Sequence, residues 1–378
     1  MKEKSEKLYH IELLRFIFSV IIVYYHILHA NIMNNVGTAA EQYKALNTSC
    51  NYACAIVECF FILGGFFLYF SFWRNPEQSF GSFVQKKIAR LWPVLAFSVI
   101  LGIVFFKQKI GPQFFTLTFL SGVGLGKASG GINWYISPYF WTMLFYFGLL
   151  KCVKQKKTQN LIIAILVYFS YVINIFNTDG GFGRKVVSFG LSLELLRAVA
   201  SIGMGYLLAA ITESFEPFLQ AITENKTKDI IFRIFVSVLE IICCACLTIH
   251  FLYKKYAYNA HFIVIIEFSI LLLCLVSKKG ILSILFNHKY FDIGKYSYSI
   301  YVMQQTIFWA LQRSFWKTSI VQSNIPATII LSLVICVISG IIVYKFIEKP
   351  FGKLLSKPLP QKIPEVENVE PGIEEKSE

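Results

Sequence analysis

The stretch Ile11–Ala30, IELLRFIFSVIIVYYHILHA, decides the fold class, because it is apolar over its whole length apart from four residues that can carry charge. A helix needs about 20 mostly apolar residues to cross the hydrocarbon core of a bilayer. The stretch is too long for the apolar part of a cleavable signal peptide, and it has no small-residue cleavage site. It therefore predicts a membrane-spanning helix that carries Glu12, Arg15, His26 and His29.

The whole chain shares this apolar character. Of its 378 residues, 56% are hydrophobic and only 15% are charged, whereas soluble domains contain about 25% charged residues. The net charge of +14 could indicate binding to nucleic acid. However, the basic residues form small groups between apolar stretches, so we interpret them as determinants of membrane topology and expect no nucleic-acid partner.

Ten segments have roughly the length and apolar composition of a transmembrane helix. They are Ile11–Ala30, Asn51–Phe72, Ile88–Phe106, Ile132–Leu150, Leu161–Phe176, Leu193–Ile211, Ile230–Phe251, His261–Val276, Tyr298–Leu311 and Ala327–Phe346. The sequence predicts an all-α polytopic membrane protein with about ten transmembrane helices, built as one domain over residues 1–353. Between the third and fourth segments, Lys107–Gly131 is expected to form a long outer loop that dips towards the membrane at Phe114–Leu120.

Basic residues also predict the orientation. Ten crossings place 21 lysines and arginines on the side of both termini and 11 on the other side. Because basic residues accumulate in cytoplasmic loops, both termini are expected in the cytoplasm. We expect a multi-pass protein of the cell membrane, either a plasma membrane or a bacterial inner membrane. Residues 354–378 contain four prolines and six glutamates, which predicts a disordered acidic cytoplasmic tail.

His26 and Glu58 are ionisable residues inside expected spans, where charge is costly and therefore indicates function. Counted from Ile11, His26 lies about 22 Å above the inner edge of the membrane. Counted from Asn51, Glu58 lies about 10 Å below the outer edge, so in a core about 30 Å thick the two share one level. A carboxylate bonded to His26 would fix its tautomer and strengthen it as a base. Alternatively, the two residues only compensate each other's charge and hold two helices together.

A second group of interest is the cationic pair Lys87 and Arg90. The two residues are three positions apart and therefore share one helix face, which suits a phosphate ligand. The alternative is an ordinary positive-inside cluster at a helix end. Arg15 and His26 are eleven residues apart, so they face the same way about 16 Å from each other. No constellation of residues suits a metal ion.

Five segments, in this order and spacing, resemble the acyltransferase-3 family of integral-membrane acyltransferases. They are Arg15 to His26, an arginine and a histidine with ten residues between them; Val57–Phe66, VECFFILGGF; Lys87–Pro93, KIARLWP; Gly294–Tyr301, GKYSYSIY; and Ile347–Phe351, IEKPF. The resemblance covers about residues 8 to 353.

The resemblance implies transfer of an acyl group, usually acetyl, from a cytoplasmic coenzyme A thioester to a hydroxyl of a cell-surface or lipid-linked glycan. His26 would be the general base or an acyl relay, with Glu58 as its partner. Arg15, Lys87 and Arg90 would hold the phosphates of the donor. Acetyl-CoA is the expected co-substrate without a metal, and the expected partners are the acyl-CoA donor, the glycan acceptor and membrane lipids.

Three residues depart from the family pattern. Lys87 stands where arginine is usual, so a bidentate phosphate contact becomes a point charge. Gly64 replaces a usual serine, and Gln304 occupies a position where many members have histidine.

Two other classes of protein remain open from the residues. A transporter or exporter of a glycan or small metabolite would use Glu58, Glu240 and Glu267 as coupling groups. A non-catalytic scaffold for polysaccharide assembly would need none of these residues.

Overall fold

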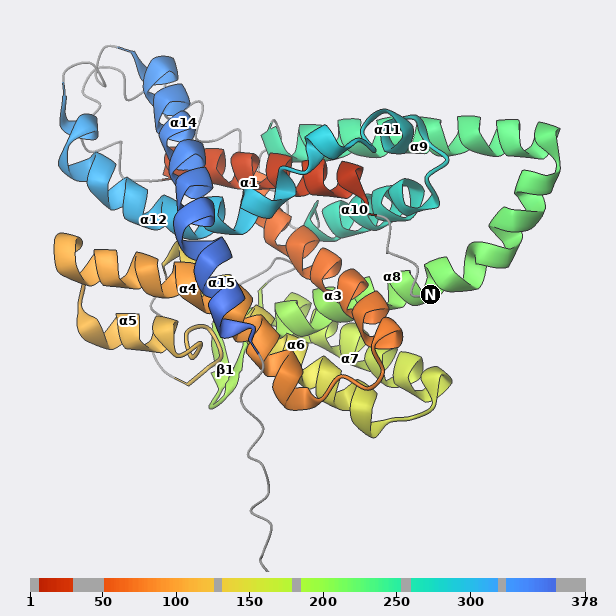
Figure 1. Ribbon diagram of the computed structural model, residues 1–378, viewed down its shortest axis with the longest axis horizontal. Coiled ribbons are helices and arrows are strands. Elements are labelled where there is room, and N and C mark those ends of the chain that lie inside the picture. Colours follow the sequence, from red (N-terminus) through yellow and green to blue (C-terminus); the bar gives the residue numbers. More distant parts are fainter. Residues whose placement is uncertain are drawn as a thin grey trace, which may run out of the picture.

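The computed structural model describes residues 7–29, 51–125, 131–178, 185–252, 260–318 and 324–357 (Figure 1). Its α-helices are α1 (Tyr9–His29), α3 (Ile56–Arg74), α4 (Phe80–Phe106), α5 (Ile110–Leu117), α6 (Ile136–Cys152), α7 (Lys156–Asn177), α8 (Leu193–Glu224), α9 (Lys226–Leu252), α10 (Ala260–Ser277), α11 (Ile281–Leu285), α12 (Ser297–Arg313), α14 (Ile325–Val343) and α15 (Lys349–Leu355). Short 3-10 turns precede three of them, namely η3 (Asn51–Ala55), η4 (Ile132–Tyr135) and η6 (Gly294–Tyr296), and the π-helical turn η8 (Tyr344–Glu348) joins α14 to α15. Two short strands, β1 (Val186–Ser188) and β2 (Leu191–Ser192), pair in an antiparallel hairpin.

Each of the ten expected spans forms a helix. Seven helices in the described ranges are long and apolar enough to cross a membrane: α1, α3 with the end of η3, α4, α7, α8, α9, and α14 with the turns that follow it. The remaining three expected spans are the shorter helices α6, α10 and α12, with 17, 18 and 17 residues. The prediction of an all-α polytopic membrane protein is confirmed. Ten crossings and cytoplasmic termini stay predictions, and the expected tail lies outside the described residues from position 358 onward.

Helices α3 and α8 run side by side and approach each other at glycines. A Cβ atom on Gly65 would overlap the carbonyl of Ile202, and one on Gly205 would overlap the carbonyl of Ile62. Lipid tails are as apolar as leucine, so helices in a membrane associate through close backbone contact and polar bonds rather than through the hydrophobic effect. The two glycines supply this close contact in the middle of the helix pair.

A polar cluster closes the far end of the same helix pair. The Tyr69 hydroxyl donates a hydrogen bond to the Glu213 carboxylate, and the Lys156 ammonium binds the same carboxylate at 2.9 Å. The rings of Tyr69 and Tyr206 meet edge to face with centroids 4.9 Å apart. Because Tyr69 is on α3, Glu213 on α8 and Lys156 on α7, this cluster joins three helices.

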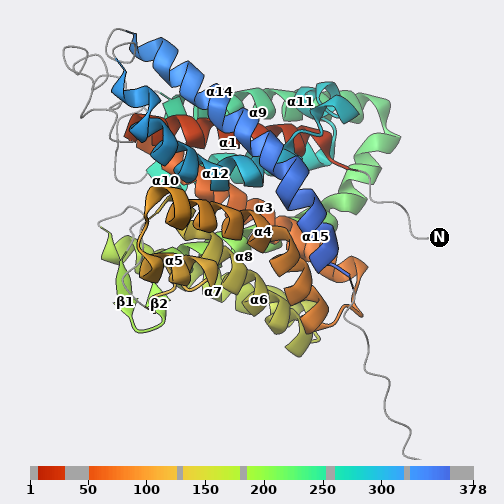
Figure 2. The same cartoon turned by 60° about the vertical axis from the view of Figure 1, so that its left-hand side comes forward.

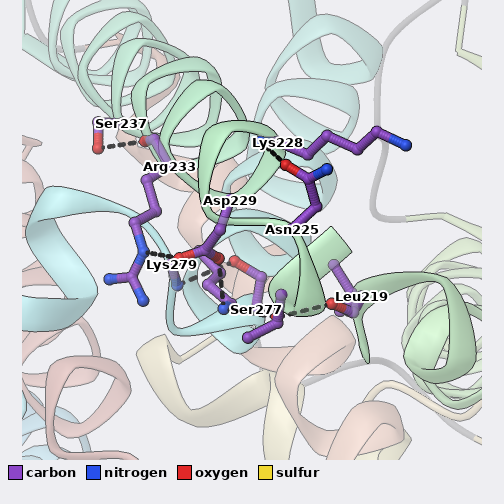
Figure 3. A network of polar contacts seen from close by, with 9 residues as sticks. Leu219, Asn225, Lys228, Asp229, Arg233, Ser237, Ser277 and Lys279 are labelled. Atoms are coloured by element: carbon purple, nitrogen blue, oxygen red, sulfur yellow. Dashed lines mark hydrogen bonds and ion pairs between the residues drawn. The ribbon is translucent and has the colours of Figure 1, made fainter. Parts of the chain in front are cut away.

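Beyond that cluster, α8 and α9 extend out of the bundle and meet in an elbow (Figure 1). Asp229, on the first turn of α9, accepts bonds from Arg233 and Lys279, both at 2.7 Å (Figure 3). Lys279 also donates to the hydroxyl of Thr223 on α8 at 2.9 Å. The elbow is therefore fastened to the segment between α10 and α11.

At the opposite end, the β-hairpin packs against the segment that follows α5. Gly190 donates to the carbonyl of Gly124 at 3.2 Å, and the Ser192 hydroxyl donates to the carbonyl of Gly122 at 2.5 Å. Gly122 and Gly124 have φ angles of 71° and 85°, in a region that glycine adopts without strain. Part of the expected outer loop therefore has a defined structure. Helix α5 is a short helix, and the carbonyls of Gly122 and Gly124 bind the hairpin.

Replacement of Gly205 by alanine is expected to destabilise the protein. The new methyl group overlaps the Ile62 carbonyl, which belongs to backbone and cannot rotate away, and such overpacking costs about 1–3 kcal/mol. Thermal unfolding of the purified protein in detergent measures the change. Gly81→Ala is the matched control, because a Cβ there meets no atom within 4 Å; equal unfolding temperatures for both variants would contradict the packing argument.

Candidate active site

A cavity of about 420 Å³ opens among α1, α3, α4, α6 and α12. Its wall includes Arg15 from α1, Gly64 from α3, Lys87 and Arg90 from α4, Tyr139 from α6 and Tyr301 from α12. The three cations that the sequence assigned to a phosphate site therefore line one cavity, although they come from two helices. Most of the remaining wall is apolar or aromatic, which suits the uncharged part of a long ligand.

The cations of this cavity differ in how they are held. Arg15 Nη1 lies 2.9 and 3.1 Å from the two carboxylate oxygens of Glu12, one turn earlier on α1. The Lys87 ammonium lies over the rings of Phe83 and Tyr139, 5.1 and 5.5 Å from their centroids. Glu12 also lines the cavity, so one carboxylate faces three cations there. The wall keeps a positive excess that favours an anionic ligand.

The start of α12 positions this wall, because four successive residues contact four different elements. Tyr298 donates to the Leu91 carbonyl of α4 at 2.5 Å, and Ser299 donates to a carboxylate oxygen of η8 at 2.5 Å. Ile300 packs where Gly340 of α14 leaves room, and Tyr301 donates to a carbonyl of η4 at 2.8 Å. Successive helical residues point about 100° apart, so a short segment can contact elements on several sides. Helix α12 packs against α14, α1 and α4 (Figure 2).

The Glu348 carboxylate, the acceptor of the bond from Ser299, was not assigned a role from sequence. It is 6% exposed and lies close enough to Arg90 and Arg15 to interact with both electrostatically. The π-helical turn that carries it is a feature often found at functional sites. Its signal in the sequence is an acidic residue at the end of an apolar span, within the Ile347–Phe351 segment.

His26 lies on α1 beside the cavity and is half-buried. Its ring is 6.5 Å from that of Tyr301, centroid to centroid, in an edge-to-face arrangement. Tyr301 also packs edge to face on Tyr135 at 4.5 Å, and both tyrosines line the cavity. Tyr301 therefore contacts the cavity and the histidine at once.

Glu58 does not have the partner that the sequence predicted. Its Oε1 atom accepts bonds from Arg197 Nε at 2.7 Å and Nη2 at 2.6 Å, while its Oε2 atom has no hydrogen-bond partner. In the described part of the chain, Glu58 thus binds Arg197 rather than His26. Equal depth in the membrane does not fix which way a helix face points, and this face of α3 points towards α8.

Arg197 is, like Glu348, a residue to which no role was assigned from sequence. Its guanidinium also lies 4.8 Å from the Trp134 ring centroid, in a cation–π contact. Both members of the ion pair are buried. A buried pair is costly to break, because removing one partner leaves a charge without compensation.

The other carboxylates that a transporter would use also have partners. Glu240 accepts a hydrogen bond from the Leu282 backbone at 2.7 Å and so caps the start of α11. Glu267 lies 3.0 Å from the Nδ1 atom of His250. These contacts join α9 to α11 and to α10. Both carboxylates therefore have a structural role, and their position inside the bundle no longer specifically indicates the coupling groups of a transporter.

A cavity with a basic wall inside a bundle of apolar helices is the arrangement expected of a membrane protein whose site suits an anionic ligand. A family model described as an acyltransferase domain matches residues 8–344. The chain therefore belongs to the acyltransferase-3 family, and it is a multi-pass membrane acyltransferase. Searches of curated proteins and of solved structures gave no match. Among the residues that the structure describes, no three histidines, cysteines or carboxylates are grouped to hold a metal ion.

Replacing Glu58 by alanine is expected to lower the stability of the fold. Arg197 would remain buried without its anion, at a cost of about 3–5 kcal/mol. The unfolding temperature in detergent measures this loss, and the double variant Glu58→Leu with Arg197→Met should recover most of it. A Glu58→Ala protein with unchanged stability and reduced turnover would instead indicate a direct role in the chemistry.

Proposed function

We propose that this acyltransferase moves an acetyl group from acetyl-CoA to a hydroxyl of a cell-surface or lipid-linked glycan. One observation carries the proposal: Arg15, Lys87 and Arg90 line a single cavity, and Tyr301 connects the wall of that cavity to His26. The transporter alternative has no comparable support, because each carboxylate it invoked is engaged in joining helices.

The cations suit the phosphate end of coenzyme A. Arg90 is exposed and Lys87 is half-buried. The positive charge of the wall therefore extends from the opening of the cavity, its mouth, into the interior. Lysine and arginine are the residues that bind phosphate most strongly, arginine in a bidentate manner and lysine as a point charge. The unequal distribution of basic residues along the chain supports placing this mouth on the cytoplasmic side, where coenzyme A is present.

The remaining cavity wall suits the pantetheine arm and the thioester. Tyr135, Tyr139 and Met143 provide apolar surface beside the cations. Arg15 and His26 are separated by eleven residues of α1, a rise of about 16 Å. A donor bound by its phosphates near Arg15 would extend along this direction and bring the thioester towards Tyr301 and His26.

His26 would act as the general base at that point. An acceptor hydroxyl gives its proton to the imidazole while its oxygen bonds to the thioester carbon. The carbon–sulfur bond then breaks, and the departing thiolate takes the proton from the imidazolium. The products are an acetyl ester and free coenzyme A, and the imidazole is returned to its neutral state.

The variant His26→Ala is expected to lose acyl transfer, because a positioned general base contributes about 10²–10⁴-fold to rate. The measurement is transfer of labelled acetyl from acetyl-CoA to surface glycan, with acyl mass and acceptor identified by mass spectrometry. His29→Ala is the matched control, since His29 is an exposed histidine one turn further along α1. Activity of His26→Ala at the wild-type level would refute the proposed role of this histidine.

The variants Lys87→Met and Arg90→Met are expected to weaken binding of coenzyme A by about 10- to 100-fold each, since a hydrogen bond to a charged group contributes about 1.5–3 kcal/mol. Isothermal titration calorimetry of the protein in detergent measures this affinity. Lys86→Met is the control, because Lys86 is an exposed neighbour that does not line the cavity. Equal losses in all three variants would show that only general surface charge matters.

A further inference from the structure

A second cavity, of about 150 Å³, lies between α4, α5, η4 and α12. Its polar wall consists of Ser98, Gln108, Gln113, Thr116, Asn133 and Gln305. The rest of the wall is formed by Trp134, Trp309, Val99, Pro112 and Gly131. Among the residues that the structure describes, no lysine, arginine, aspartate or glutamate lines it, in contrast to the cationic cavity.

The two cavities lie at different levels along the same helices. Ser98 follows Arg90 by eight residues of α4, a rise of about 12 Å, and Gln305 follows Tyr301 by about one turn of α12. The Tyr301 hydroxyl donates to the carbonyl of Ile132, the residue directly before Asn133. Tyr301, which also contacts His26, therefore stands between the cationic cavity and the uncharged one.

Asn133 supplies an independent indication that this second cavity takes a ligand. The residue is 8% exposed, and its amide nitrogen donates to the Val302 carbonyl at 3.5 Å. Its Oδ1 atom is buried and has no hydrogen-bond partner. A buried acceptor without a donor destabilises a fold by about 1–3 kcal/mol. Asn133 also lines the cavity, so a rotation of its side chain would bring Oδ1 within reach of a ligand hydroxyl and remove this cost.

The chemistry of the wall selects one class of ligand. Amides and hydroxyls donate and accept hydrogen bonds as sugar hydroxyls do, and indole rings offer flat apolar surface and an N–H donor. Because the described part of the wall carries no cation, it does not compensate the desolvation of a carboxylate or phosphate. The volume is below the roughly 300–1,000 Å³ of drug-sized sites, which fits a single sugar ring.

We propose that the cavity beside Asn133 binds one uncharged sugar unit of the acceptor glycan. This inference rests on the proposed glycan acyl transfer and adds the position and charge of the acceptor unit. The sugar enters from the side opposite the cations, and one hydroxyl reaches past η4 towards His26. Three residues then determine acceptor specificity. They are Asn133, Gln113 on α5, and Gln108 just before α5.

Saturation-transfer difference NMR on the full-length protein in lipid nanodiscs tests this without requiring turnover. The probes are methyl β-D-glucopyranoside, methyl N-acetyl-β-D-glucosaminide and the anionic methyl β-D-glucuronide. Signals are expected from at least one neutral glycoside and at least fivefold weaker ones from the glucuronide. In Asn133→Ala and Gln113→Ala, the neutral signals are expected to fall at least fivefold, whereas Gln220→Ala, an exposed amide on the α8 extension, should retain them.

Gln113 is only half-buried, so Gln113→Ala keeps the test valid if Asn133→Ala does not fold. Coenzyme A affinity is measured on the same samples and is expected to be unchanged. Equal neutral signals in wild type and both cavity variants, or no signal from either neutral glycoside, would overturn the inference. Failure of the proposed acyl transfer is a separate result, recognised by absent coenzyme A binding or by a fully active His26→Ala protein.

Discussion

The close contact between α3 and α8 is the constraint on which the site depends. Gly65 and Gly205 let the two backbones touch, and the buried Glu58–Arg197 pair fixes the register of the helices at one end. In a bilayer these contacts, rather than the hydrophobic effect, hold helices together. Because Gly65 faces α8, the neighbouring Gly64 is turned to the cationic cavity, so the packing of α3 sets a wall of the site.

The second constraint is the start of α12. Its residues Tyr298 to Tyr301 contact α4, η8, α14 and η4 in turn. A one-residue slip of this helix would rotate every one of these contacts by about 100°. The segments Lys87–Pro93, Gly294–Tyr301 and Ile347–Phe351 are far apart in sequence, yet they meet here. Their side chains form one polar framework around the cavity, in which Glu348 balances part of the charge of Arg15 and Arg90.

The sequence could predict what depends on one helix at a time. Apolar length locates the spans, and the three-residue spacing of Lys87 and Arg90 gives their common face. Depth places His26 and Glu58 at one level, but the neighbour of a helix face depends on packing between helices. For this reason the Glu58–Arg197 pair, which spans 139 positions, could not be found from local patterns. Glu194 lies three residues before Arg197, so spacing alone would suggest a pair within one helix.

Two cavities of different electrostatic character lie on either side of η4. Tyr135 of η4 and Tyr301 line the cationic cavity, and Asn133 and Trp134 of η4 line the polar one. In the proposed function, the cationic cavity would bind the phosphorylated donor, and the polar cavity would bind a ligand rich in hydroxyl groups. Such a division would keep an anionic donor out of the proposed acceptor site, because its desolvation there would not be compensated. Gln304, one turn beyond Tyr301 and fully buried, has no hydrogen-bond partner for either amide atom. A neutral amide can accept a hydrogen bond from a hydroxyl and donate one to a carbonyl, whereas a protonated histidine at the same position could only donate.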